Sequence, residues 1–259
     1  MGNSDGLQSL IIDPFLIRVL EEIDTVHGEI LIGELPQERI DNGVLAAMEY
    51  RWKTDEFVFL LPPAQEGHPP PLIVCHELLH ASLLLNGWPL FRSRVDYSGD
   101  NELEDAIGTL IDLAQHVVIW PAMEILGYNE EDNWTYDVAF LISIVASGAF
   151  FQKYPRDDDL PIRAISLAEA LLSPAKAEVK TRLRAIASEF LPQDAQLAAT
   201  IESLFERARP FSPKSCLNAF YQSFETAGGS REILPASSLP KIHKGFLQWV
   251  LDLRQRLKK

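Results

Sequence analysis

The chain is poor in cysteine and in basic residues. Cys75 and Cys216 are the only cysteines among 259 residues, which excludes a disulfide framework and favours a reducing compartment. Lysine and arginine number 23 against 37 aspartates and glutamates, so the formal net charge is -14. A chain of this charge is not drawn electrostatically to nucleic acid or to anionic membrane, and we expect neither as a partner.

We also expect neither a targeting segment nor a membrane-spanning run in this sequence. The first ten residues, MGNSDGLQSL, lack the basic and apolar regions of a signal peptide, and Gly6 stands where a myristoylation pattern needs serine or threonine. The most apolar run, Val138 to Phe151, is too short to span a bilayer and is typical of a buried helix. We therefore expect a cytoplasmic protein, whose oligomeric state no pattern in the sequence indicates.

Strand patterns are confined to the first quarter of the chain. We expect a helix over Pro14 to Ile23, a strand within Gly28 to Leu35, a short helix over Val44 to Met48, and a strand over Glu56 to Leu61 that ends at two prolines. Hydrophobic residues make up 47% of the sequence and charged residues 23%, which is typical of a globular protein with a sizeable core.

Helical patterns dominate the rest. We expect helices over Glu102 to Leu126, Tyr136 to Gln152 and Lys241 to Leu257, and helix starts at Ser173-Pro174 and Ser212-Pro213. The polar, proline-bracketed stretch Tyr154 to Pro161 predicts a boundary between a domain of residues 1–155 and a helical C-terminal region of residues 156–259. The predicted fold class is α+β, mainly α.

One further helix carries a recognisable motif. Pro71 suits a first helical turn and Gly87 a position just past the last one, so Leu72 to Asn86 should be helical. Inside it lies the H-E-x-x-H pattern His76-Glu77-Leu78-Leu79-His80. Residues four apart lie above one another on a helix, so the two imidazoles can reach one metal ion.

This pattern predicts metal-dependent hydrolysis. His76 and His80 would be two ligands of Zn²⁺, and Glu77 would take a proton from metal-bound water. The ion lowers the pKa of that water towards neutrality, so a nucleophile exists at cellular pH. The alternative is a solvent-facing stripe of polar residues without a metal.

A catalytic zinc site usually takes a third protein ligand, and the following helix offers one. Asp105, Thr109, Asp112 and His116 are spaced as one helix face between apolar flanks. His116 is the first choice as third ligand, while Asp112 could orient a ligand or bind the metal itself. The same stripe also fits the solvated side of an amphipathic helix.

The stretch IVCHELLHASLLLNGWP, followed by a helix ending in QHVVIWPAMEILGY, resembles the zincin metallopeptidases. It is particularly similar to small bacterial zincins of the regulator-cleaving ImmA/IrrE type, over roughly Glu56 to Tyr128. The resemblance implies a zinc-binding helix packed beside a short sheet and a second ligand helix. It also implies that the edge strand of this sheet holds an extended substrate, and that this strand is Phe57 to Leu61.

The sequence departs from that family in one respect. Its members place a glutamate ligand on the second helix shortly before a proline, whereas the polar residues nearest to Pro121 here are Asp112 and His116. Glu102 and Glu104 lie much further back. The third ligand is therefore His116, Asp112 or another carboxylate.

Two functions remain at this point. The first is a zinc-dependent metallopeptidase that cuts a protein or peptide, with Glu77 as general base. The second is a zincin-like binding or regulatory module with structural metal or none, in which the helical C-terminal region docks a partner protein.

Overall fold

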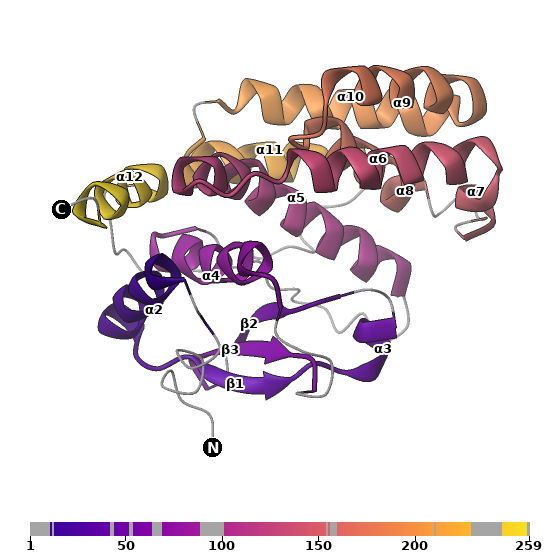
Figure 1. Cartoon of the computed structure of the whole chain (residues 1–259). Helices are drawn as coiled ribbons and strands as arrows, with labels where there is room; N and C mark the ends of the chain where they lie inside the picture. Colours follow the sequence, from indigo (N-terminus) through magenta and orange to yellow (C-terminus); the bar gives the residue numbers. More distant parts are fainter. Residues whose placement is uncertain are drawn as a thin grey trace. The chain divides into compact units, whose positions relative to one another are not determined.

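The structure, a computed structural model, describes residues 11, 13–41, 44–51, 54–63, 69–88, 101–153, 155, 160–209, 211–228 and 245–257. Its elements are shown in Figure 1. The chain is mostly helical, with one small mixed sheet, which confirms the predicted α+β, mainly α class.

The chain divides into two compact units. One comprises residues 1–88, 125–128 and 240–259, and the other comprises residues 89–124 and 129–239. The boundary predicted at residues 155/156 falls inside the second unit and stays a prediction about domains. Helix α5 begins in the second unit and ends in the first.

The sheet of the first unit has the strand order β1-β3-β2. Strand β1 (Leu31–Glu34) runs parallel to β3 (Glu56–Leu61), and β2 (Ala47–Arg51) runs antiparallel to it. The predicted strands within Gly28 to Leu35 and over Glu56 to Leu61 are confirmed. On β1, a Cβ added to Gly33 would meet the Leu60 side chain at 2.7 Å, so a larger residue at this position would force that side chain to move.

Two expectations about this sheet were wrong. The short helix predicted over Val44 to Met48 does not form: residues 44–46 have no regular structure, and strand β2 begins at Ala47, where pairing with β3 outweighs local helix propensity. The substrate-binding edge strand was assigned to Phe57 to Leu61, but this segment is the central strand. All five of its residues are buried, as expected for a strand with neighbours on both sides, and β1 and β2 are the edges.

Helices α2, α4 and α12 complete the first unit. Helix α2 (Pro14–His27) confirms the first predicted helix, and its N-cap Asp13 accepts hydrogen bonds from the Phe15 backbone N–H and the Tyr128 hydroxyl. Helix α4 (Pro71–Leu85) confirms the motif helix and packs against α2 and β2 (Figure 1). Helix α12 (Phe246–Leu257) confirms the end of the last predicted helix, and its Arg256 pairs with Glu22 of α2 at 2.7 Å.

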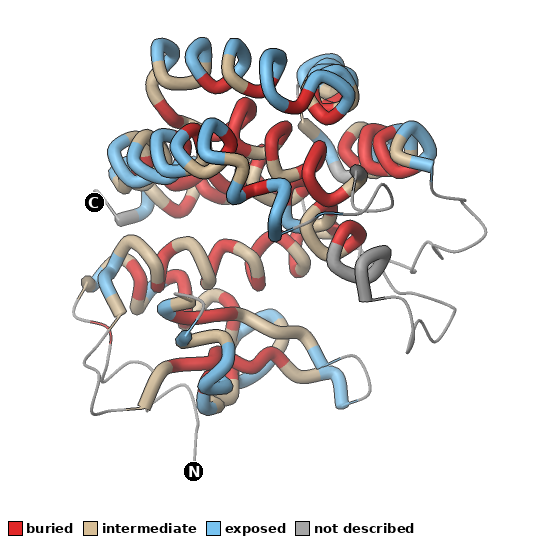
Figure 2. Tube along the Cα trace, turned by 90° about the vertical axis from the view of Figure 1, so that its right-hand side faces the viewer, coloured by how far each residue is buried: buried red, intermediate tan, exposed pale blue. Residues whose placement is uncertain are grey.

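The second unit is helical in every segment that the structure describes. Its helices after α5 (Asn101–Leu126) are α6 (Glu131–Ala146), α7 (Ala149–Lys153), α8 (Leu160–Leu172), α9 (Ala177–Phe190), α10 (Pro192–Arg207) and α11 (Pro213–Thr226). Buried residues recur along one side of α9, α10 and α11 and exposed residues along the other, whereas none of the described residues of α8 is exposed (Figure 2). The short helix α3 (Gln37–Asp41) belongs to the first unit.

The ends of the helices in this unit agree only in part with the ends predicted from the sequence. A capping box between Ser212 and Ser215 confirms the predicted start of α11. The helix expected at Ser173-Pro174 begins later, after Lys176. The single helix expected over Tyr136 to Gln152 is two helices, because the chain turns at Gly148, which has a φ of +76°.

One segment of the described residues, Ala106–Leu126 within α5, is long and apolar enough to cross a membrane. Two thirds (67%) of an 18-residue apolar window within this segment is buried inside the protein, and the core helix of a globular domain has the same composition. The absence of a membrane partner stays a prediction.

A buried ion pair joins two helices of the second unit. The Arg163 side chain of α8 donates to the Asp194 carboxylate of α10, and both residues are only 4% exposed. We expect Asp194→Ala to lower the free energy of unfolding by about 3–5 kcal/mol, because it leaves the Arg163 charge buried without its partner. Urea denaturation followed by circular dichroism measures the loss.

The matched control is Glu202→Gln, which removes the more exposed Arg184–Glu202 pair between α9 and α10. That change should lower the free energy of unfolding by less than about 1 kcal/mol, because solvent-exposed ion pairs contribute little. If the two variants lost the same free energy of unfolding, the burial of the Arg163–Asp194 pair would not be the cause of the loss.

Candidate metal centre

The H-E-x-x-H motif occupies the less buried strip of α4. Val74, Cys75, Leu78 and Leu79 are almost fully buried and hold the helix in place. His76, Glu77 and His80 are half-buried, and their spacing of one, three and four residues keeps them on one side of the helix. The apolar faces therefore fix the orientation of the strip that carries the polar groups.

His76 and His80 present matching nitrogens. Their Nε2 atoms lie 3.1 Å apart, with the rings inclined at 62°. Two nitrogens bound to one tetrahedral zinc ion at about 2.0–2.1 Å would be separated by about 3.3 Å. The pair is thus close to the spacing that one ion requires, and both nitrogens belong to the same helix.

Glu77 reaches the edge of the sheet. Its Oε2 accepts a hydrogen bond of 2.7 Å from the backbone N–H of Met48 on β2. Strand β2 is an edge of the three-stranded sheet, so its backbone N–H groups that do not pair with β3 are open to a side-chain acceptor. The bond orients one oxygen of the carboxylate and ties the motif helix to the strand.

His116 lies on α5 with a carboxylate partner that the sequence analysis missed. Its Nδ1 is 2.7 Å from Oε1 of Glu169 on α8, and the two side chains are 16% and 17% exposed. Burial by itself lowers the pKa of His116, but the hydrogen bond and charge of Glu169, with the charges of Asp112 and Glu130, outweigh it. The resulting pKa lies above the usual value for histidine, so protons compete with a metal for this ring.

Aromatic side chains line one side of His116. The Trp120 ring lies one turn further along α5, with its centroid 5.5 Å from that of His116. Trp134 of α6 meets Trp120 edge to face at 5.2 Å. These rings limit the access of water to His116 and strengthen its interaction with the Glu169 carboxylate.

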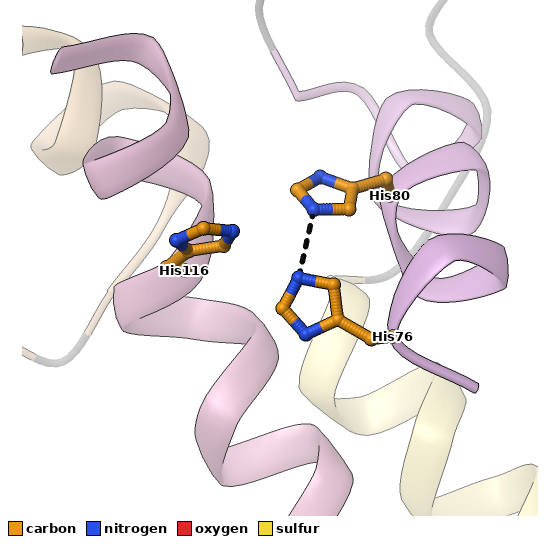
Figure 3. Close-up of side chains that lie close together, drawn as sticks. All are labelled: His76, His80 and His116. Atoms are coloured by element: carbon orange, nitrogen blue, oxygen red, sulfur yellow. Dashed lines mark hydrogen bonds between the residues drawn. The ribbon is translucent and has the colours of Figure 1, made fainter. Parts of the chain in front are cut away.

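His76, His80 and His116 form a group that could hold a metal ion. Each offers one ligand atom, and these atoms all lie within 4.8 Å of one another (Figure 3). Asp112, the alternative ligand, is exposed and is not in the group that the described residues form. Three imidazoles are donors that suit zinc and other transition metals, so the residues present fit such an ion while leaving its identity open.

The chain has other candidates for a hydrolytic site. Tyr136, whose hydroxyl is a group that can stabilise an oxyanion, is 73% exposed on α6. His27 ends α2 and lies 3.4 Å from the Asp55 carboxylate. The other candidates lie outside the residues whose side chains the structure describes: Arg92, Arg94, Tyr97, Glu102, Glu104, Asp105, His68 and His243.

Comparisons of the chain with protein-family models, with curated proteins and with solved structures gave no match. The interpretation of the site therefore depends on its own residues.

We expect the protein, purified without chelator, to contain one equivalent of a divalent transition metal. His76→Ala should remove most of it, because one imidazole of the α4 pair is lost. Metal content measured by mass spectrometry checks this. His27→Ala is the matched control, since it removes a histidine that is bonded to Asp55 instead. Unchanged metal content in His76→Ala would contradict the site.

Proposed function

We propose that the protein is a zinc-dependent metallopeptidase that cuts a protein or peptide substrate. The observation that carries this proposal is the 3.1 Å separation of His76 Nε2 and His80 Nε2 on the helix that also bears Glu77. Support also comes from the pairing of His116 with Glu169, because a carboxylate on the far ring nitrogen is the usual partner of a metal-binding histidine. The sheet packed against α4 supports a zincin-like core.

Each residue has a distinct role in this proposal. His76, His80 and His116 would hold the ion, each through one imidazole nitrogen. A bound zinc ion supplies a Lewis acid that lowers the pKa of water to about 7. Glu77 is the general base that takes a proton from the attacking water and delivers it to the leaving amine.

The edge strand β2 is the part of the first unit suited to an extended substrate. Among the residues that the structure describes, β2 pairs with a strand on one side only, and Glu77 contacts the strand at the Met48 N–H. A peptide that pairs with β2 would therefore have its backbone beside the Glu77 carboxylate. This argument favours a polypeptide over a small hydrolysable ester or amide.

A second candidate function has one observation in its favour. The hydrogen bond from Met48 to Glu77 gives this carboxylate a structural role, which a non-catalytic protein could also use. In that case the chain is a binding or regulatory module whose metal, if bound, is structural.

Glu77→Gln separates the two functions. The amide oxygen still accepts the hydrogen bond from Met48, so the fold and the metal content should stay unchanged. The amide cannot act as a base, so we expect hydrolysis to fall by about 100-fold or more. The probe is a library of unstructured peptides, in which new N-termini are counted by mass spectrometry.

The control for metal dependence is the same assay on protein whose metal has been removed by chelation and then restored with zinc. Wild-type protein that holds a full equivalent of zinc and yet leaves the library uncut would overturn the peptidase in favour of the binding module. Equal cleavage by the wild type and Glu77→Gln would remove Glu77 from the proposed mechanism.

A further inference from the structure

A buried carboxylate of the helical C-terminal region faces the third histidine of the candidate site. Glu169 lies on α8, and its Oε1 is 2.7 Å from Nδ1 of His116 on α5. Both side chains are more than four fifths buried. Both residues belong to the second unit, so this contact is internal to it.

The contact decides which nitrogen of His116 carries the proton. A carboxylate accepts hydrogen bonds, so the imidazole must donate through Nδ1–H. In the neutral ring, the lone pair is then on Nε2, which is also the atom that His76 and His80 direct at each other. Without Glu169, the two tautomers of His116 would compete, and one of them has no lone pair on Nε2.

Glu169 is also an unusual residue in its surroundings. It lies on an otherwise apolar stretch of α8, between Ala168 and Ala170, which are both almost fully buried. A carboxylate in such a place costs free energy unless it is paired. In the part of the chain that the structure describes, His116 is the partner that the Glu169 carboxylate has.

We propose that Glu169 is a positioning residue of the metal centre, which holds His116 with its Nε2 lone pair and its ring orientation ready for the ion. This inference rests on the proposed function only in its metal site, not in peptide hydrolysis. It makes α8 a part of the metal centre, although α8 lies outside the stretch that resembles zincins.

Zinc affinity of the full chain, measured by competition with a chromophoric chelator, tests this role. We expect Glu169→Ala to weaken zinc binding by about 100-fold and Glu169→Gln by about 10-fold, within the range found for carboxylate partners of metal-binding histidines. Glutamine recovers part of the affinity because its amide oxygen still accepts the Nδ1–H bond but lacks the charge. It also keeps the shape of the side chain, so it decides the question if the alanine variant does not fold.

A double-mutant cycle separates positioning from general stabilisation. In a His116→Ala background, where no ring remains to be oriented, Glu169→Ala should have no further effect on zinc affinity. Asp194→Asn is the matched control, because it weakens the other buried ion pair of α8 and leaves His116 untouched. We expect its zinc affinity to equal that of the wild type.

The outcomes separate this inference from the proposed function. Wild-type zinc affinity in both Glu169 variants would overturn the positioning role and leave the metal site standing. An equal loss from Glu169→Ala in both backgrounds would also overturn it, because the residue would then act through the fold alone. A wild-type protein that binds zinc, loses affinity on Glu169 substitution and cuts no peptide would refute the peptidase and support the positioning role.

Discussion

The partial burial of two imidazoles on one helix face is the constraint on which the site depends. A polar group withdrawn from water without a partner costs about 1–3 kcal/mol. The Nε2 atoms of His76 and His80 lie 3.1 Å apart on the half-buried strip of α4. A hydrogen bond between them uses one proton and one lone pair, whereas a cation between them would use both lone pairs. The packing of α4 against α2 and β2 fixes the orientation of the helix, so the two nitrogens are left either to hydrogen-bond to each other or to share a cation.

The surroundings of His116 have two opposing effects on metal binding. The charges of Glu169, Asp112 and Glu130 raise its pKa and would also attract a divalent cation. A proton and a metal ion thus compete for the same ring nitrogen of His116, and the same three negative charges attract both. The metal gains more from that field because it carries two charges, but at acidic pH the proton is far more abundant. Neutral to alkaline conditions therefore favour the ion.

Local patterns in the sequence predicted the motif helix well and the sheet less well. Pro71 and Gly87 mark the ends of α4, and the spacing of a polar stripe, together with the preference of zinc for imidazole, pointed to His116. The first two residues of strand β2 were predicted as the end of a helix because the apolar residues from Val44 to Met48 favour helix locally, while the pairing of β2 with β3 depends on residues further along the chain. Glu169 was missed for the same reason, since it lies 53 residues from His116. A lone carboxylate within the apolar pattern of α8 was the one signal that could have revealed it.

The return of α12 to the first unit has a consequence for how the protein is made. Helix α2 has its ion-pair partner Arg256 in a helix that leaves the ribosome only after all of residues 89–239. The second unit is complete in sequence before the first, so it can fold during translation while α2 still lacks its neighbour. The N-terminal unit, although its synthesis begins first, is therefore the last to be finished, and chaperones would meet it before the Glu22–Arg256 ion pair can form.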